Sequence, residues 1–262
     1  MADALLWAYA FAFGAALGSF LNVCIYRLPA EKSVVAPPSA CGACGTRIRW
    51  YDNIPILSFI LLRGRCRACS APISLQYPVI ELACALIWTA AAIRFGPSLD
   101  AVHSATFLTL LLGIAMTDAR EMVIPDQFTL LGGLLGIGLA AVPGGVRILD
   151  ALLGAAIAYA LLWVVKWIAE RILKKPALGV GDIHMMAMVG AFIGPAGALL
   201  TLMLGSVFGL LFGIPIQWVR GRLSPLATYL PLGVFLAMGA AIAHVWGSAL
   251  IGWYLRSVVG VA

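Results

Sequence analysis

Two aspartates stand at the edges of long apolar segments in this sequence. Asp118 opens the run Asp-Ala-Arg-Glu-Met-Val-Ile-Pro-Asp, and Asp182 closes the run Gly179-Val180-Gly181-Asp182. Only 11% of the residues are charged, and a carboxylate at membrane depth is costly, so its first interpretation is functional. Two carboxyls that can meet are able to share one proton and perform acid–base chemistry. Asp118 and Asp182 are therefore the candidate catalytic residues.

Four cysteines have the spacing of a metal site. Cys41 and Cys44 form one C-x2-C knuckle, and Cys66 and Cys69 form another. Each knuckle presents two thiolates from one tight turn, and tetrahedral zinc takes four such ligands. The pattern predicts a structural zinc site with no open coordination position; a redox dithiol and unliganded thiols are the alternatives. A reducing cytoplasm argues against two disulfides.

The composition is typical of a membrane protein. The 262 residues are 63% hydrophobic and the mean hydropathy is +1.02, whereas soluble chains are about half apolar and about a quarter charged. We expect an all-α polytopic membrane protein with about eight transmembrane helices. Gly194-Pro195 marks the turn between the sixth and seventh. The predicted segments are 4–26, 78–95, 99–117, 123–142, 148–169, 183–196, 197–218 and 229–250.

A polar segment divides the chain into a first transmembrane helix (1–27), an insert that carries the cysteines (28–77) and a helical core (78–262). If the insert is cytoplasmic, all but three of the 17 Lys and Arg residues fall on the inner side; the exceptions are Arg94, Arg147 and Arg256. We therefore expect a bacterial inner-membrane protein with both termini periplasmic and with the insert and both aspartates facing the cytoplasm. Basic residues in the insert can serve as a topology determinant or can recognise an acidic partner.

Several motifs follow one another in the order found in a known family. They are residues 18–29, 50–55, 64–69 and 77–81, followed by the Asp118 motif and Gly179–Asp182. The sequence resembles bacterial type IV prepilin peptidases in these motifs. The resemblance implies an inner-membrane aspartic endopeptidase that removes the short basic leader of type IV prepilins or type II secretion pseudopilins. The cut follows a glycine at the cytoplasmic face. It also implies N-methylation of the new terminus with S-adenosylmethionine, Asp118 and Asp182 as catalytic pair, and the four cysteines as zinc ligands. We also expect the protein to contact membrane lipid and not to bind nucleic acid.

Further residues are expected to position the substrate or the backbone. Gly179 and Gly181 allow the chain to bend and to approach an extended peptide. Asp126 is expected to cap the fourth segment, with replacement of Asp118 in the pair as the alternative. His184, where the family commonly has Lys, is interpreted as a packing or hydrogen-bonding substitute. Glu121 is expected to be solvated.

Two ligands of the expected reactions lack a decisive sequence signal. A basic leader can be held by acids near the cleft, and the candidates are Glu81, Glu121 and Asp126. The sequence has no glycine-rich nucleotide loop after a strand, so it predicts no Rossmann-type donor site. The candidates for binding S-adenosylmethionine are Glu81, Asn53 and Trp50.

Two other classes of protein fit parts of the pattern. A proton-coupled transporter can use Asp118 and Asp182 as a relay, but such carriers often have paired repeats and none is visible. A non-enzymatic assembly factor of a pilus or secretion system can dock a partner through the zinc-bearing insert. That hypothesis leaves the Gly-x-Gly-Asp motif without a purpose.

Overall fold

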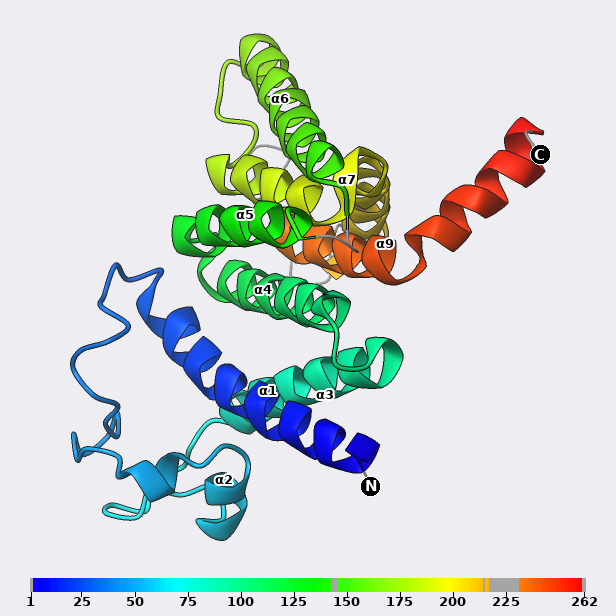
Figure 1. Cartoon of the computed structure of the whole chain (residues 1–262). Coiled ribbons are helices and arrows are strands. Elements are labelled where there is room, and N and C mark those ends of the chain that lie inside the picture. The colour runs from blue at the N-terminus through cyan, green and yellow to red at the C-terminus, as the bar shows by residue number, and fades with distance from the viewer. Residues whose placement is uncertain (1, 143–145, 214, 217–230, 261–262) are drawn as a thin grey trace. The chain divides into compact units, whose positions relative to one another are not determined.

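The computed structural model describes residues 2–142, 146–213, 215–216 and 231–260, and these residues are helical or irregular (Figure 1). The part described contains no named strand, so the predicted all-α class is confirmed. Internal contacts divide the chain into two units, residues 1–109 and 110–262, and helix α4 runs from one into the other. The elements are α1 (Ala2–Arg27), η1 (Trp50–Asn53), α2 (Leu57–Leu61), α3 (Gln76–Phe95), α4 (Leu99–Glu121), α5 (Asp126–Ala140), α6 (Ile148–Leu173), α7 (Val180–Phe208), η2 (Gly209–Gly213), α9 (Leu232–Tyr254) and η3 (Leu255–Val259).

In the first unit, α1 and α3 cross closely through small residues (Figure 1). A Cβ added at Gly18 of α1 would lie 2.6 Å from Glu81 Cα of α3, and one added at Gly14 would lie 2.9 Å from Ala85 Cα. Glycine at both positions lets the two backbones approach, as small residues do between membrane helices. Between these helices the insert has little regular structure beyond η1 and α2.

The second unit is built around α7, which packs against α5, α6 and α9. Met185, Met186, Val189 and Phe192 on α7 are completely buried, so this helix forms the core that positions the chain around Asp182. The crossing of α6 and α7 is close enough that a Cβ at Gly190 would collide with the backbone of Gly154.

Each predicted apolar segment has a helical counterpart, with two changes. Six helices of the described part are long and apolar enough to cross a membrane: α1, α3, α4, α6, α7 with η2, and α9 with η3. Helix α5 has only 15 residues, about 22 Å against a hydrocarbon core of about 30 Å. The predicted sixth and seventh segments form one helix that is broken at Gly194 (φ 69°, ψ −178°) before Pro195.

The number of spans therefore stays a prediction, and so does the three-part division of the chain. The interruption at Gly194 lies where the turn between the sixth and seventh segments was predicted. Some predicted features lie outside the described residues: the end of the seventh segment, the start of the eighth, and the basic residues Arg220 and Arg222.

Candidate active site and metal centre

Asp118 lies in the last turn of α4 and is buried, with 5% of its surface exposed. Its Oδ2 accepts a hydrogen bond from the backbone N–H of Val234 at 3.1 Å, and the N–H of Gly233 also interacts with it. Both N–H groups belong to the first turn of α9, where they have no partner within the helix. The positive end of the α9 dipole thus faces the Asp118 carboxylate.

Asp182 lies in the first turn of α7, three residues after Gly179, the N-cap. Its carboxyl turns back to the backbone N–H of Gly179, as the third helical residue does in a capping box. A Cβ at Gly179 would lie 2.9 Å from Asp182 Oδ2. Glycine at position 179 therefore leaves room for the carboxyl of Asp182 to fold back.

Ile124 connects the two aspartate segments. A Cβ at Gly181 would lie 2.9 Å from Ile124 Cβ, and a Cβ at Gly233 would lie 2.8 Å from Ile124 Cδ1. The Asp118 and Asp182 carboxyls are near enough to interact electrostatically. The structure thus brings together the two predicted aspartates, which lie 64 positions apart in the sequence. Two neighbouring carboxyls titrate as a unit, one able to accept a proton while the other donates one.

The prediction that Asp126 caps its helix is wrong. The N-cap of α5 is Pro125 and no side chain caps this end. The Asp126 carboxylate instead lies 2.8 Å from His184 Nδ1, and the His184 ring stacks on Tyr159 of α6 with a centroid distance of 6.2 Å. Asp126 is exposed, and its Oδ1 contacts His184 of α7. His184 thus makes the kind of hydrogen bond expected of it.

Two residues that sequence reasoning missed hold the loop before the Gly-x-Gly-Asp motif. Lys166 of α6 donates to the carbonyl of Leu178 at 2.8 Å and pairs with Glu170 one turn later at 2.8 Å. Glu170 also accepts the backbone N–H of Ala177. The only sequence signal was a Lys–Glu pair at i, i+4 in an apolar segment, a spacing that stabilises helices.

Of the two remaining acidic candidates, Glu121 is exposed and Glu81 is buried. Glu121 is exposed and lies 4.0 Å from Arg120, as expected for a solvated residue. Glu81 is buried, accepts the N–H of Ile56 at 2.7 Å and hydrogen-bonds Ser19. Trp50 and Asn53 are exposed, and the contacts described for Glu81 do not include either of them. The assignment of these three residues to the methyl donor stays a prediction.

The four cysteines of the insert converge on one point. Their sulfurs all lie within 4.8 Å of one another, and Cys41 Sγ is 3.8 Å from Cys69 Sγ. Zn–S bonds of about 2.3 Å in a tetrahedron place sulfurs about 3.8 Å apart. The geometry of the cluster fits the predicted zinc, and the four side chains could hold a metal ion.

Each knuckle is closed by its own backbone. The N–H of Cys41 donates to Thr46 O and that of Gly45 to Cys41 O, and Cys66 and Ser70 repeat the pattern. Hydrogen bonding to Thr46 lowers the pKa of the Cys44 thiol to about 6. The N–H of Ala71 favours the Cys69 thiolate, but the neighbouring cysteine sulfurs raise the pKa of Cys69 to about 12. A bound cation offsets such repulsion and deprotonates its thiols.

Comparison with known proteins agrees with this arrangement. Residues 12–95 match the bacterial peptidase A24 N-terminal domain, and residues 105–214 match the type IV leader peptidase family. A prepilin leader peptidase/N-methyltransferase of Pseudomonas putida is 35% identical over 90% of this chain and 89% of that protein. The chain belongs to the type IV leader peptidase family.

Other members of the type IV leader peptidase family that bear the same name are similar over most of this chain. The protein from Aeromonas hydrophila is 34% identical over 98% of this chain and 97% of its own length. The protein from Myxococcus xanthus (strain DK1622) is 38% identical over 83% of this chain and 65% of its own length. No solved structure matches the chain. The cysteines lie in the first matched region and both aspartates in the second.

Proposed function

We propose that this protein is a membrane-embedded aspartic endopeptidase that removes the leader from type IV prepilins or type II secretion pseudopilins. The observation that carries the proposal is the meeting of Asp118 and Asp182 at the first turns of α9 and α7. The relatives' common name, prepilin leader peptidase/N-methyltransferase, supports the choice of substrate. The cut follows a glycine at the cytoplasmic face of the inner membrane, with both termini of the chain on the periplasmic side.

The two carboxyls divide the work of hydrolysis by sharing one proton. The ionised carboxyl takes a proton from water as that water attacks the scissile carbonyl. The protonated carboxyl donates to the carbonyl oxygen and then helps protonate the leaving amine. The N–H groups of Gly233 and Val234 stabilise negative charge on Asp118. Gly179 leaves room for the Asp182 carboxyl to fold back, and Gly181 leaves room for Ile124 beside the start of α7.

Glu121 and Asp126 hold the basic leader in this proposal. Both are exposed and follow Asp118 closely in the chain, whereas Glu81 is buried and engaged with Ile56. Charge reversal at Glu121 or Asp126 should raise KM more for a basic leader than for a neutralised one. Equal effects on both leaders would contradict the electrostatic role.

N-methylation of the new N-terminus is proposed on the names of the relatives alone. S-adenosylmethionine would supply the methyl group. Glu81, Asn53 and Trp50 stay the candidates for holding the methyl donor.

The proposal is tested by cleavage of a prepilin that carries a Gly–Phe junction, with the full chain purified into nanodiscs. We expect Asp118→Asn and Asp182→Asn each to reduce kcat by a factor of at least about 100, since general acid–base groups contribute about 10²–10⁴-fold. Asp100→Asn, at the opposite end of α4 from Asp118, is the matched control and should cleave normally. Full cleavage by either variant would rule out the shared-proton pair. Absence of cleavage by the wild-type chain would favour the transporter or assembly hypothesis. A mass gain of one methyl group on the product tests methylation separately.

A further inference from the structure

Helix α2 and the neighbouring turn η1 present an apolar surface that the described residues of the chain leave exposed. Leu57, Ile60 and Leu61 on α2 are 49%, 63% and 71% exposed, and Trp50 on η1 is 80% exposed. Such side chains favour an apolar environment over water. An exposed group of this kind marks a surface that contacts a partner or a membrane.

The start of α2 is fixed against α3. Ile56, the residue before α2, donates its N–H to Glu81 Oε2 at 2.7 Å, and Glu81 is buried in α3. Ile56 itself has φ 64° and ψ −52°, and the next N–H, that of Leu57, donates to Pro55 O at 2.6 Å. A β-branched residue adopts a positive φ only where its surroundings impose it. The position of α2 along α3 is therefore defined.

With α3 as a membrane span, as its length and composition allow, that position lies near the surface of the bilayer. Helix α3 has 20 residues, about 30 Å, which is the thickness of the hydrocarbon core, so its first residue lies near the membrane boundary. Glu81 comes five residues after Gln76, which is about 1.4 turns or about 7.5 Å along the helix axis. Apolar side chains of interfacial helices enter the membrane to about 5–10 Å. Helix α2 is held at this depth.

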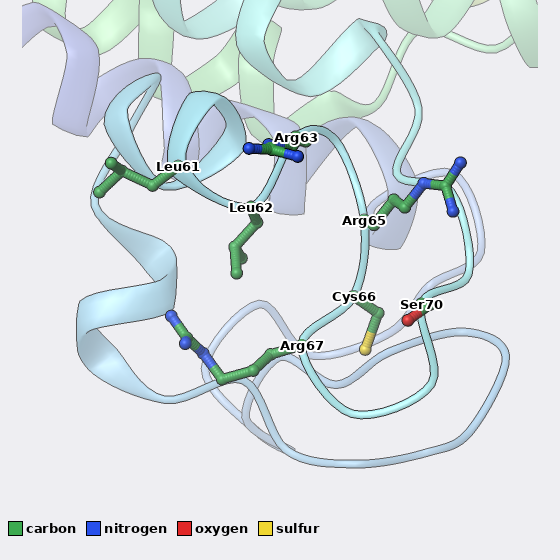
Figure 2. A pocket seen from close by; sticks show the side chains of 7 residues that line it. All are labelled: Leu61, Leu62, Arg63, Arg65, Cys66, Arg67 and Ser70. Carbon is green, nitrogen blue, oxygen red and sulfur yellow. The ribbon is translucent and has the colours of Figure 1, made fainter.

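Arginines follow the apolar residues directly. Arg63 and Arg65 line a cavity of about 590 Å³ together with Leu61, Leu62, Cys66, Arg67 and Ser70 (Figure 2). In Figure 2 the Leu62 side chain points into the space between Arg63 at one edge and Arg67 at the other. Arg67 pairs with Asp52 at 2.6 Å. Within the described parts of the chain, Arg63 and Arg65 have no acidic side chain at ion-pair distance.

We propose that Trp50, α2 and the two arginines form a lipid-binding surface that docks the insert on anionic phospholipid of the same membrane. The apolar side chains enter the acyl layer, and Arg63 and Arg65 bind the phosphates of the headgroups. A soluble anion could pair with the arginines but would leave Ile60 and Leu61 exposed to water. An anionic lipid satisfies both parts of the surface at once.

The test uses the full chain in nanodiscs with the photo-crosslinking residue p-benzoylphenylalanine at position 60. We expect lipid adducts at this position, several-fold more in nanodiscs that contain phosphatidylglycerol than in nanodiscs of phosphatidylcholine alone. Arg63→Gln with Arg65→Gln should lower the adduct yield in phosphatidylglycerol to the level found in phosphatidylcholine. The control, Lys32→Gln with Arg47→Gln, removes the same charge from exposed positions of the same insert and should leave the yield unchanged.

Several results would overturn the proposal. One is the absence of lipid adducts at position 60 while the same crosslinker at the exposed Leu86 of α3 labels lipid. Another is an equal loss of adducts in both double variants, which would indicate a general effect of charge. Adducts to a second copy of the chain, or equal yields in the two lipid compositions, would also contradict it. Equal metal content of the variants confirms that the insert is folded, and none of these results depends on peptidase activity.

Discussion

The backbone N–H of Val234 donates a hydrogen bond to Asp118 Oδ2 at 3.1 Å, joining residues 116 positions apart. Gly233 makes this approach possible, because a Cβ there would lie 2.9 Å from the same oxygen and 2.8 Å from Ile124 Cδ1. The first turn of α9 thus sets the position and the charge environment of one carboxyl of the proposed pair. Residues outside the two aspartate motifs therefore belong to the site.

Gly233→Ala should displace the Asp118 carboxyl and reduce kcat strongly with little change in KM. A misplacement of about 1 Å can cost about 100-fold in rate, and the added methyl cannot be accommodated beside Asp118 without such a shift. Steady-state cleavage of a prepilin measures the effect. Gly247→Ala adds a methyl to the same helix, where the nearest atom is Leu200 Cδ2 at an ordinary 3.6 Å, and should cleave normally. Normal kcat in Gly233→Ala would show that the position of Asp118 does not limit the reaction.

Lys166→Met should lower kcat by roughly 10-fold to 100-fold, because the loop that leads to Asp182 loses its anchor on α6. Lys166→Arg keeps a donor at this position and should restore part of the rate. Lys175→Met removes an exposed charge from the same loop and should have little effect. If Lys166 contributed only its charge, Lys166→Met and Lys175→Met would instead change kcat by the same factor.

Local patterns in the sequence predicted the chemistry of both sites. The cysteines converge because each C-x2-C knuckle closes through its own backbone hydrogen bonds, and the spacing within a knuckle sets that geometry. The break at Gly194 was likewise predictable, since Pro195 cannot donate a helical hydrogen bond. The assignment of Asp182 to the edge of a helix followed from the long apolar segment that begins directly after it.

Contacts between distant segments could not be predicted in the same way. Asp126 has the residue type and place of an N-cap, yet its oxygen contacts His184, which lies 58 positions away. The anchor from Lys166 to Leu178 depends on the angle at which the chain returns after α6. Gly179 and Gly181 were interpreted through the substrate, whereas their nearest contacts are Asp182 and Ile124 within the protein.

Gly45→Ala should weaken metal binding by the insert. Gly45 has φ 69°, and an L-residue in this conformation costs about 1–2 kcal/mol, or roughly tenfold in the metal dissociation constant. Competition with a chromophoric chelator measures this constant. Gly42→Ala changes the same knuckle at a position with no positive φ and nothing within 4 Å of the added carbon, so it should bind normally. Similar losses in both variants would mean that the backbone conformation of Gly45 is not the cause.

Removal of the metal should unfold the insert and leave the second unit intact. The insert has few regular elements and little apolar core of its own, so the free energy of metal binding supplies much of its folding free energy. In the chelated protein, trypsin should cut at Arg47 and Arg49 much faster than in the metal-loaded protein, while far-ultraviolet circular dichroism should change little. Cys66→Ser should reproduce this sensitivity, because three ligands remain.

Cys24→Ala serves as the control, since this thiol lies in α1 and not in the cluster. It should keep the protease resistance of the wild-type chain. The Arg67–Asp52 ion pair, at 2.6 Å, connects the second knuckle with η1, but a single ion pair near the surface contributes little to stability. That contribution is too small to hold the insert without a metal ion. Undiminished resistance to trypsin after complete chelation would therefore show that the cysteine cluster does not stabilise the fold of the insert.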